Sequence, residues 1–328
     1  MPTYQENLTA IQTEEIWQRL EAETGGPLKD PTVYSASKLH GMTGCSWRYW
    51  LESTGAVPET RSLALARGRA VHSTIARLHR ERLWPDWFDL FKAEWDAELA
   101  NPDESVLPWS NDETEEQIIA EFDDAHQIVE NYVERERETP VLATEVPFRM
   151  ILVHTRTGTR YRLAGTVDQP IIDRDRLILR DLKTNATAPN EAYLARNYQF
   201  STYGLALRRG VFLVNGEPIS FGRYPDRLEW YQLHHLLPYK RAGKRGDGTS
   251  YVKGDLRGEP VIEVKRTTAD YDFFRAEACR VIQIMRMKLF VRSPDPIGCS
   301  MCRYSTACLT GDAIRLDDLT GKLIEESA

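Results

Sequence analysis

The spacing of hydrophobic residues along this chain changes near residue 140. Before that point they recur at intervals of three and four residues, which is typical of amphipathic helices. The clearest stripe follows an i, i+4, i+7, i+11 spacing and consists of Ile118, Phe122, Ala125, Val129, Tyr132 and Val133. Residues 1 to about 30 form a polar leader with one helical stretch at 13–23. The pattern therefore predicts a mainly helical region over residues 1–140.

After residue 140, short apolar runs replace the helical pattern and predict the strands of one mixed sheet. These runs lie at residues 141–148, 160–163, 177–183 and 228–234. Helical patterns at residues 191–207 and 270–291 would flank the sheet. Interleaved helices and strands indicate the α/β class, so we expect an α/β core over residues 141–290 and a separate C-terminal segment over residues 291–328.

Length and composition agree with one large folded domain, or with a core that carries a helical appendage. The 328 residues are 41% hydrophobic and include eight tryptophans. The sequence has no run of about twenty apolar residues that could span a bilayer, and no apolar signal segment opens it. We therefore expect a protein that works in the cytoplasm without a membrane contact.

Charge is distributed unevenly along the chain. The net charge is −7, which by itself disfavours a protein that holds DNA. Residues 93–138, however, include 16 acidic and 2 basic residues, so the rest of the chain carries +7. We expect the helix in this segment to turn its acidic face to solvent, away from any nucleic acid.

A basic, glycine-rich segment lies at residues 240–266. It contains eight basic and four acidic residues with five interspersed glycines. This composition predicts a mobile loop that could contact a phosphate backbone through Lys240, Arg241, Lys244 and Arg245. A loop that is simply solvated is the alternative.

Two carboxylates and a lysine are the strongest candidates for chemistry. Asp168 ends the run Ala164-Gly165-Thr166-Val167-Asp168, and Asp181-Leu182-Lys183-Thr184 follows it thirteen residues later in an apolar strand. Side chains alternate along a strand, so Asp181 and Lys183 point to one face and Leu182 points to the other. A hairpin of this length can return Asp181 to the side of Asp168.

Paired carboxylates of this kind offer the hard oxygen ligands that Mg²⁺ and Mn²⁺ prefer. A metal bound there lowers the pKa of a water molecule, and the adjacent lysine orients the nucleophile or offsets phosphate charge. The trio therefore suits metal-assisted hydrolysis of a phosphodiester. An ordinary surface hairpin with solvated charges is the alternative interpretation of these residues alone.

Two helical patterns extend this set. Gln199 and Tyr203 lie four residues apart and share one helix face, beside residues with core character. His72 lies near the start of another helix, in Gly68-Arg69-Ala70-Val71-His72. Each of the three could also be structural: His72 as a core hydrogen-bonding residue, and Gln199 and Tyr203 as part of a helix face packed on the sheet.

The order of these motifs resembles the RecB-type exonucleases of the PD-(D/E)xK superfamily, which have a helix histidine, G-x-x-D, D-x-K-T and Q-x-x-x-Y. The resemblance implies a restriction-endonuclease-like fold with a mixed sheet flanked by helices. It implies five catalytic residues: Asp168, Asp181, Lys183, Gln199 and Tyr203. It implies Mg²⁺ or Mn²⁺ held by His72, Asp168, Asp181 and the carbonyl of Leu182. Gln169-Pro170 departs from the family, which usually continues this strand with apolar or basic residues.

The five cysteines form a second candidate site. Three of them have the spacing Cys299-x-x-Cys302-x5-Cys308, and Cys45 lies 254 positions before Cys299. An odd, low cysteine count without a signal segment disfavours a disulfide framework. Four converging thiolates could hold tetrahedral Zn²⁺ or a [4Fe–4S] cluster, and spacing alone does not separate the two. Cys279 follows a helical apolar pattern and is expected to be a buried thiol.

The resemblance favours the cluster. AddB-type nuclease domains and CRISPR-associated RecB-like nucleases carry one early and three late cysteines around iron and sulfur, and Cys45, Cys299, Cys302 and Cys308 match that layout. Ser46 stands where these proteins usually have proline. A link between positions 45 and 299 would close a very long loop and reduce the entropy of the unfolded chain. We expect a structural cluster, with redox sensing as the alternative.

Two classes of function fit these features of the sequence. The first is a metal-dependent DNA exonuclease that acts on single strands or DNA ends in DNA processing, recombination or repair. The second is a non-catalytic nucleic-acid-binding or assembly module that keeps the nuclease fold. The sequence has no helicase motif G-x4-G-K-[S/T], so any unwinding would come from a helicase or recombination partner.

Overall fold

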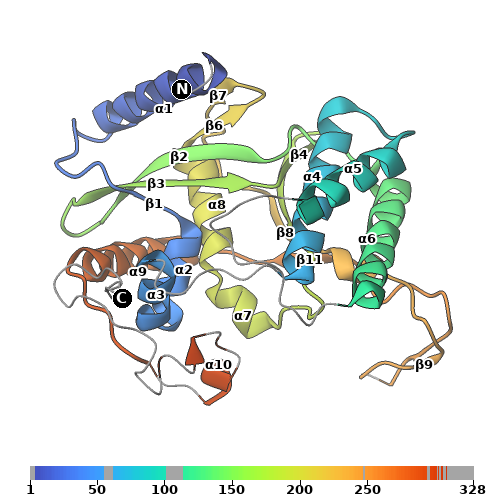
Figure 1. Cartoon of the computed structure of the whole chain (residues 1–328). Coiled ribbons are helices and arrows are strands. Elements are labelled where there is room, and N and C mark those ends of the chain that lie inside the picture. The colour runs from blue at the N-terminus through green and yellow to red at the C-terminus, as the bar shows by residue number, and fades with distance from the viewer. Residues whose placement is uncertain are drawn as a thin grey trace, which may run out of the picture.

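The computed structural model of this chain describes residues 4–54, 62–100, 114–246, 248–293, 296–300, 302, 304–305 and 308 (Figure 1). The part of the predicted C-terminal segment that follows residue 308 lies outside these residues. The described elements confirm a mixed α/β architecture. No helix in the described ranges is long and apolar enough to cross a membrane.

Helices dominate the first part of the chain, as predicted. They are α1 (Tyr4–Glu23), α2 (Ala36–Gly44), α3 (Ser46–Thr54), α4 (Leu63–Glu81), α5 (Trp87–Ala100) and α6 (Glu115–Glu136), and the short strand β1 (Val33–Tyr34) precedes α2. Local hydrogen bonds fix where they begin. The side chain of Ser62 accepts a hydrogen bond from the amide of Leu65 at the start of α4, and Thr114 and Gln117 form a capping box at the start of α6.

Strands and helices alternate from residue 146 onward. The strands are β2 (Val146–Val153), β3 (Arg160–Val167), β4 (Gln169–Asp173), β5 (Arg176–Lys183), β6 (Val211–Val214), β7 (Glu217–Ile219), β8 (Arg227–Gln232), β9 (Gly243–Lys244), β10 (Ser250–Tyr251) and β11 (Val261–Val264). The helices are α7 (Glu191–Arg196), α8 (Tyr198–Arg209), the 3₁₀ turn η1 (Leu233–Leu236), α9 (Thr268–Arg286) and α10 (Pro296–Ser300).

The expectation of one mixed sheet is wrong. A five-stranded sheet has the order β1-β3-β2-β6-β7, and a four-stranded sheet has the order β11-β8-β5-β4. The chain passes from the first sheet to the second at Asp168, the single residue between β3 and β4. The strands exchange partners there, because β3 pairs with β2 whereas β4 pairs with β5.

Two other local expectations also need correction. The predicted helix at residues 191–207 is divided at Asn197, whose side chain accepts a hydrogen bond from the amide of Gln199 (2.9 Å) and so begins α8. The predicted mobile loop at residues 240–266 contains the β9–β10 hairpin and β11.

Two hydrophobic cores lie on opposite faces of the four-stranded sheet. Leu177 and Leu179 of β5 pack in the larger core with α8, α9 and the five-stranded sheet. Leu182 of the same strand packs in a second core with α4, α5 and α6, which lie together on one side of the molecule (Figure 1). Strand β5 is therefore buried on both faces, which explains its continuous apolar run.

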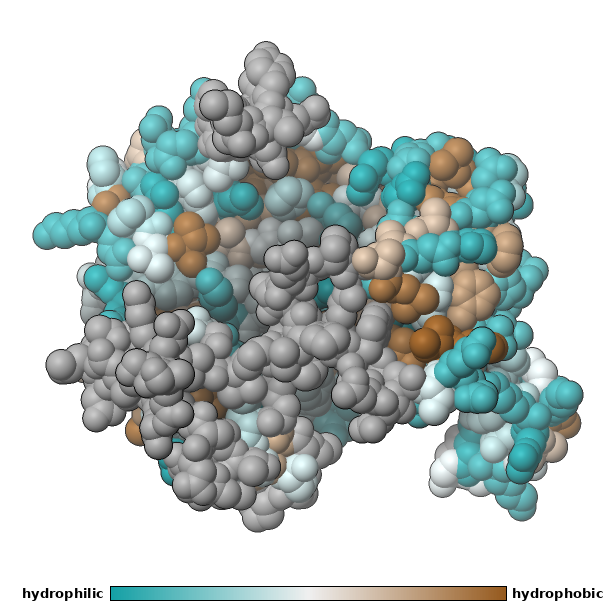
Figure 2. Space-filling view, in the orientation of Figure 1, coloured by the Kyte–Doolittle hydropathy of each residue, from teal (hydrophilic) through white to brown (hydrophobic). Residues whose placement is uncertain are grey.

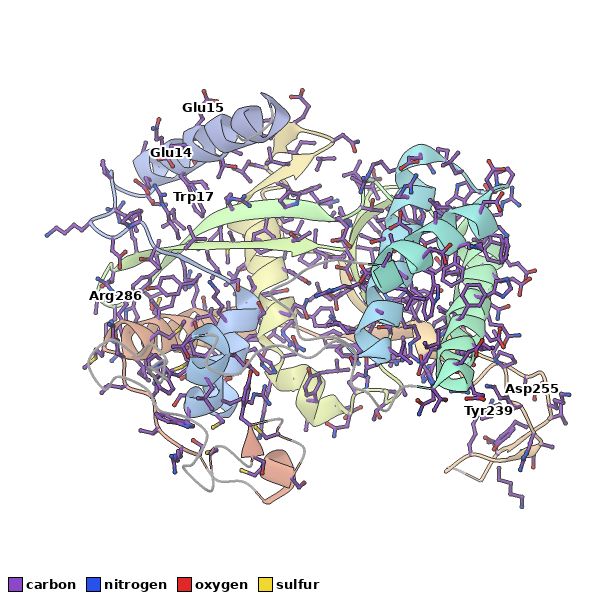
Figure 3. All side chains as sticks on the ribbon, in the orientation of Figure 1. Glu14, Glu15, Trp17, Tyr239, Asp255 and Arg286 are labelled. Atoms are coloured by element: carbon purple, nitrogen blue, oxygen red, sulfur yellow. The ribbon has the colours of Figure 1, made fainter. Side chains whose placement is uncertain are left out.

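Helix α1 covers the outer face of the five-stranded sheet. In Figure 3, Trp17 lies on the side of α1 that faces β2 and β3. Its ring packs with Ile151 and Val211, and the guanidinium of Arg162 lies 5.0 Å from its centroid. Arg162 also pairs with Glu21 at 2.7 Å, so an ion pair and an apolar contact fix the helix together.

Buried charge joins β5 to its neighbours. Arg180 Nη1 donates to Glu136 Oε2 at the end of α6 (2.6 Å), and Arg180 Nε donates to Glu229 Oε2 on β8 (2.8 Å). The hydroxyl of Tyr231 donates to the second oxygen of Glu136 at 2.9 Å. All three charged residues are buried, so their mutual pairing is needed to offset the loss of hydration.

The acidic helix α6 is not turned wholly to solvent, contrary to expectation. Glu121 pairs with Arg67 of α4 at 2.6 Å, and Asp124 pairs with Lys240 at 3.1 Å. These contacts tie the acidic surface to basic residues of two other segments.

A second buried polar group links α4, α6 and β4. The ring nitrogen Nε2 of His79 lies 2.8 Å from the hydroxyl of Tyr132, and Gln169 Nε2 donates to the same hydroxyl at 2.8 Å. Gln169, the residue that departs from the family pattern, is fully buried. Burial, with smaller effects of Arg82 and Arg180, lowers the pKa of His79 to about 4.

We predict that His79 makes the protein less stable in mild acid. Its folded pKa lies below its ordinary value of 6.5, so the unfolded chain is protonated first as the pH falls from 6.5 toward 4. This difference should remove about 2 kcal/mol of unfolding free energy between pH 7 and pH 5. The variant His79→Gln keeps an acceptor for Tyr132 but does not titrate. Urea unfolding at pH 7 and pH 5 should show that this variant loses less unfolding free energy in acid than the natural protein. An equal loss in the two proteins would contradict the assignment to His79.

Candidate active site

The β4–β5 hairpin brings the two predicted aspartates to the same place. Gln169 pairs with Arg180 in its antiparallel register, and Asp168 and Asp181 are the next positions along the two strands. Asp168 Oδ2 accepts a hydrogen bond from the amide of Leu182 at 2.7 Å. The structure therefore forms the hairpin geometry that the sequence spacing predicted.

Asp181 is completely buried and holds Lys183 beside it. Lys183 Nζ lies 2.5 Å from Asp181 Oδ2, an ion pair within one strand. The pairing shows that the two side chains share a face of β5, as strand alternation requires. Burial alone would lower the pKa of Lys183, but the negative charges of Asp181 and Asp168 outweigh it and raise this pKa. The ammonium therefore stays protonated at neutral pH.

Helix α8 supplies the predicted glutamine and tyrosine to this ion pair. Gln199 Nε2 donates to Asp181 Oδ1 (3.0 Å), and Gln199 Oε1 accepts from Lys183 Nζ (3.2 Å). The hydroxyl of Tyr203 donates to the same Asp181 oxygen at 3.1 Å. Gln199 also donates to that hydroxyl at 2.6 Å, so both α8 side chains lie on one helix face. Four predicted residues thus form one connected network.

A cluster of three potential metal ligands lies next to this network. His72 of α4, Asp168 and Glu145 each offer one ligand atom within 4.8 Å of the other two. His72 Nδ1 lies 3.9 Å from Asp168 Oδ2. Asp181 is not a member of this cluster, because its carboxylate is directed to Lys183 and the α8 residues.

Sequence reasoning missed Glu145. It lies inside a predicted strand at residues 141–148, but the strand begins one residue later, and Glu145 has a left-handed backbone with φ of 51°. Its amide donates to the carbonyl of Asp168 at 2.9 Å, which anchors this conformation. A left-handed backbone at a residue other than glycine is strained and is common at functional sites. No spacing motif in the sequence includes Glu145. Its left-handed backbone is the only feature that marks it, and that feature is visible only in the structure.

The electrostatics of the cluster favour a cation. Burial, followed by the charge of Asp181, raises the pKa of Asp168 well above its usual range. Loss of solvation and the charge of Asp181 also raise the pKa of Glu145. Burial, with the nearby charge of Lys183, lowers the pKa of His72 to about 4, so its imidazole is neutral at pH 7. The two carboxylates have too little positive charge near them to offset their own. Together with the neutral imidazole they fit a divalent ion such as Mg²⁺ or Mn²⁺.

The cluster opens onto a cleft of about 700 Å³. His72, Glu145 and Asp168 line this cleft from three different segments. Helix α4 also contributes a row of cationic side chains to its wall: Arg69, Arg77 and Arg80. Arg77 is paired with Glu81 and Glu94 at 2.8 Å each, and Arg69 lies 3.9 Å from Glu98, so much of this positive charge is already matched by glutamates.

The four predicted cluster cysteines border one other cavity, of about 830 Å³. Cys45 lies between α2 and α3, and Cys299 lies in α10. The neighbouring residue Ser46 exchanges hydrogen bonds with the backbone of Val291, at 2.8 Å to its amide and 3.0 Å to its carbonyl. The fold therefore brings together the two sequence regions that hold these cysteines. Cys279 is separate from them and fully buried in α9, as predicted.

The predicted DNA-contacting residues lie on the β9–β10 hairpin and just before it: Lys244 is in β9 and Arg245 follows it, whereas Lys240 and Arg241 precede β9. This hairpin projects from the molecule at the lower right of Figure 2 and is largely hydrophilic. Lys240, Arg241 and Lys244 are exposed. Arg245 lies over the rings of Tyr239 and Tyr251, at 5.5 and 5.8 Å from their centroids, and these two rings stack at 3.5 Å. Figure 3 shows Tyr239 beside Asp255 at the base of the hairpin.

Comparison with known proteins identifies a family. A family model described as the PD-(D/E)XK nuclease superfamily matches residues 33–309 of this chain. No curated protein matches the chain significantly. Among solved structures, the crystal structure of SSO0001 is similar to this chain, with 12% sequence identity and a TM-score of 0.33. That match covers 91% of this chain and 96% of the other.

We predict that Glu145 contributes to metal binding. The variant Glu145→Gln removes the charge but keeps the size of the side chain, so it should weaken the binding of Mn²⁺ by at least ~10-fold. Titration calorimetry with Mn²⁺ measures this directly. Glu98→Gln is the matched control, because Glu98 lines the same cleft outside the three-residue cluster. Equal losses in both variants would show that Glu145 acts only through the general charge of the cleft.

Proposed function

The chain belongs to the PD-(D/E)XK nuclease superfamily, and on this premise we propose that it is a RecB-type exonuclease that hydrolyses phosphodiester bonds in DNA. Membership implies a metal-dependent nuclease with DNA as its substrate. The exonuclease assignment and the RecB type are our proposals, and they rest on the four ordered motifs between His72 and Tyr203.

One observation carries the proposal. The buried ion pair of Asp181 and Lys183 lies beside the cluster of His72, Glu145 and Asp168, at the junction of the two sheets. A lysine held close to candidate metal ligands has a clear use in phosphodiester hydrolysis. A pure binding module has no physical need for this arrangement, and burying the charges is costly unless they are paired. The geometry therefore favours the enzyme over the non-catalytic alternative.

We propose that His72, Asp168 and Glu145 hold a Mg²⁺ or Mn²⁺ ion. The resemblance adds Asp181 and the carbonyl of Leu182 as ligands, and Asp181 would then share its carboxylate between the ion and Lys183. When bound, such an ion makes water a stronger nucleophile at neutral pH and offsets charge on the phosphate. The neutral imidazole of His72 is ready to donate its lone pair to a metal without first losing a proton.

Lys183, Gln199 and Tyr203 hold the charged groups of the site in fixed positions. Lys183 keeps its ammonium charged and is one-quarter exposed, so it can reach a phosphate oxygen while it stays paired with Asp181. Gln199 and Tyr203 hold the carboxylate of Asp181 with two donors and limit its rotation. Fixed donors need no reorganisation when charge develops on the phosphate, which is the main advantage of a preorganised site.

We also propose that Cys45, Cys299, Cys302 and Cys308 hold a [4Fe–4S] cluster. Two observations support this: the cysteines border a single cavity, and all of them lie within the residues matched by the family model. Four thiolates are the usual ligands of such a cluster. Its role would be to fix the C-terminal segment against α3, where Ser46 and Val291 already form hydrogen bonds. Zn²⁺ is the competing occupant.

The projecting hairpin and the residues just before it are the proposed contact to the DNA backbone, through Lys240, Arg241, Lys244 and Arg245. Its exposed cations can follow phosphates without reading bases. Such contacts release counterions, so they give binding that weakens as salt increases. A helicase or recombination partner would supply unwinding where the substrate is a duplex.

The first test is cleavage of end-labelled single- and double-stranded DNA with and without Mg²⁺ or Mn²⁺. In this assay Lys183→Ala should bind DNA normally but cleave it at least ~100-fold more slowly, because its charge acts on the developing transition state. Lys240→Ala is the matched control: it should weaken binding and reduce its salt dependence, with little change in turnover at saturation. A Lys183→Ala protein with unchanged turnover would contradict the role of this lysine, and metal-independent or absent cleavage would contradict the function.

The cluster proposal predicts a visible property. Protein purified without air should be brown, absorb near ~400 nm and contain about four irons per chain. Cys299→Ser should lose the colour and stability, whereas Cys279→Ser should lose neither, because Cys279 is buried in α9 away from the cavity. Colourless protein with about one zinc per chain would assign Zn²⁺ instead.

A further inference from the structure

Helix α4 presents a row of polar side chains to the cleft of the candidate active site. Arg69, His72, Arg77 and Arg80 line this cleft from four successive turns of the helix. Residues about three or four positions apart share a helix face, so the row follows from their spacing in the sequence. The apolar face of α4 packs in the core with α5 and α6. The row therefore borders the same cleft as the candidate metal ligands.

Two of the three arginines in this row are paired within the protein. Both carboxylate oxygens of Glu81 accept from Arg77, at 2.8 and 3.1 Å, and Arg77 also donates to Glu94 of α5 at 2.8 Å. Arg69 lies 3.9 Å from Glu98, which is one turn further along α5. These pairs connect α4 to α5, so the two guanidiniums belong to the wall of the cleft.

Arg80 differs from these two arginines. It is exposed, and among the described residues its side chain forms no ion pair or hydrogen bond. Its charge nevertheless acts on the metal cluster: burial and the charge of Asp181 raise the pKa of Glu145, whereas Arg80 lowers it. The hydroxyl of Thr144 donates to the carbonyl of Ala76 at 3.0 Å, which holds the segment of Glu145 against the turn of α4 that precedes Arg80. Arg80 is therefore a cation close to the candidate metal ligands.

The charges that line the cleft leave Arg80 available for a ligand. Glu94 and Glu98 already have arginine partners. Glu145 and Asp168 belong to the candidate metal cluster, and a divalent ion would offset their charge. An arginine that remains after these pairings suits an anion from solvent, because its planar fork of donors matches two oxygens of a phosphate.

We propose that Arg80 binds a backbone phosphate next to the one that is hydrolysed, and so positions the DNA strand in the cleft. Arg80 follows His72 by eight residues, which is about 12 Å along a helix axis. Helical side chains tilt toward the N-terminus, so the guanidinium leans back along the cleft toward His72. This distance suits a neighbour of the attacked phosphate. The proposal rests on the nuclease function and adds to it a residue that fixes where the strand lies.

The first test is the salt dependence of DNA binding, measured by fluorescence anisotropy with labelled oligothymidylate in EDTA, so that no cleavage takes place. Each phosphate contact to a single strand adds about 0.7 to the steepness of log K against log salt. Arg80→Ala should therefore reduce the steepness by about 0.7 and weaken binding by ~10-fold, the scale for one charged hydrogen bond. Arg80→Lys keeps the charge but loses the fork, so it should keep the steepness and lose part of the affinity.

Arg209→Ala is the matched control. Arg209 is also an exposed arginine in the last turn of its helix, α8, but it lines a different cavity. Both alanine variants lose the favourable interaction of a cation with a helix C-terminus, so this contribution cancels when they are compared. Arg209→Ala should keep the salt dependence of the natural protein. An unchanged salt dependence in Arg80→Ala, or equal reductions in the two variants, would overturn the proposal.

Steady-state cleavage separates positioning from chemistry. Arg80→Ala should raise KM about as much as it weakens binding and change kcat little, because a neighbouring phosphate is held equally before and during the reaction. A loss of kcat with unchanged KM would instead place Arg80 at the attacked phosphate and overturn the assignment.

The binding measurement does not depend on catalysis. A protein that binds oligothymidylate through Arg80 but does not cleave DNA would contradict the nuclease function and leave this contact standing. An active protein whose binding does not depend on Arg80 would contradict only this inference.

Discussion

Strand β5 is buried on both faces, and the alternation of side chains along it determines most of what surrounds it. Asp181 and Lys183 face α8 and the larger core, whereas Arg180 and Leu182 face helices α4 to α6. A shift of register by one residue would exchange Arg180 with Asp181 and place each charge against the wrong partner. Removing one partner of a buried pair typically costs about 3–5 kcal/mol, so the contacts of Arg180 with Glu136 and Glu229 hold this register firmly. The site on one face thus depends on the ion network on the other.

The charges of the candidate site are balanced in one half and unbalanced in the other. Asp181 is compensated by Lys183 and by two donors from α8. Asp168 and Glu145 receive less compensation, and burial together with Asp181 raises the pKa of Asp168. The unbalanced half opens onto the cleft lined by arginines of α4. A divalent cation would complete this half, and a phosphate could then reach it from solvent. The location follows from topology, because Asp168 is the single residue where the chain leaves one sheet and enters the other.

A second candidate region forms where distant parts of the chain meet. Helices α2 and α3 come early in the sequence, α7 and α8 in its middle, and α9 and α10 late, yet residues from all of them border one cavity. Hydrogen bonds between Ser46 and Val291 hold the early and late parts together. Tyr193, which lines this cavity, packs edge to face against Trp230, and the ring centroid of Trp230 lies 5.5 Å from Lys183 Nζ. The proposed cluster and the candidate active site are therefore neighbours in the fold.

The sequence by itself determined the features that arise from local periodicity. These include the α/β class, the hairpin that joins Asp168 to Asp181, the shared face of Gln199 and Tyr203, and the burial of Cys279. Strand and helix periods act over a few residues, so they can be recognised without knowledge of the partners. Tertiary structure alone decided the division of the strands between the two sheets, the hydrogen bond from Gln169 to the hydroxyl of Tyr132, and the position of Glu145 near His72. Glu145 and His72 are 73 residues apart, and their approach depends on how α4 packs against the sheet junction. No local pattern encodes such a contact, because it is the packing of complete elements that brings the two side chains together.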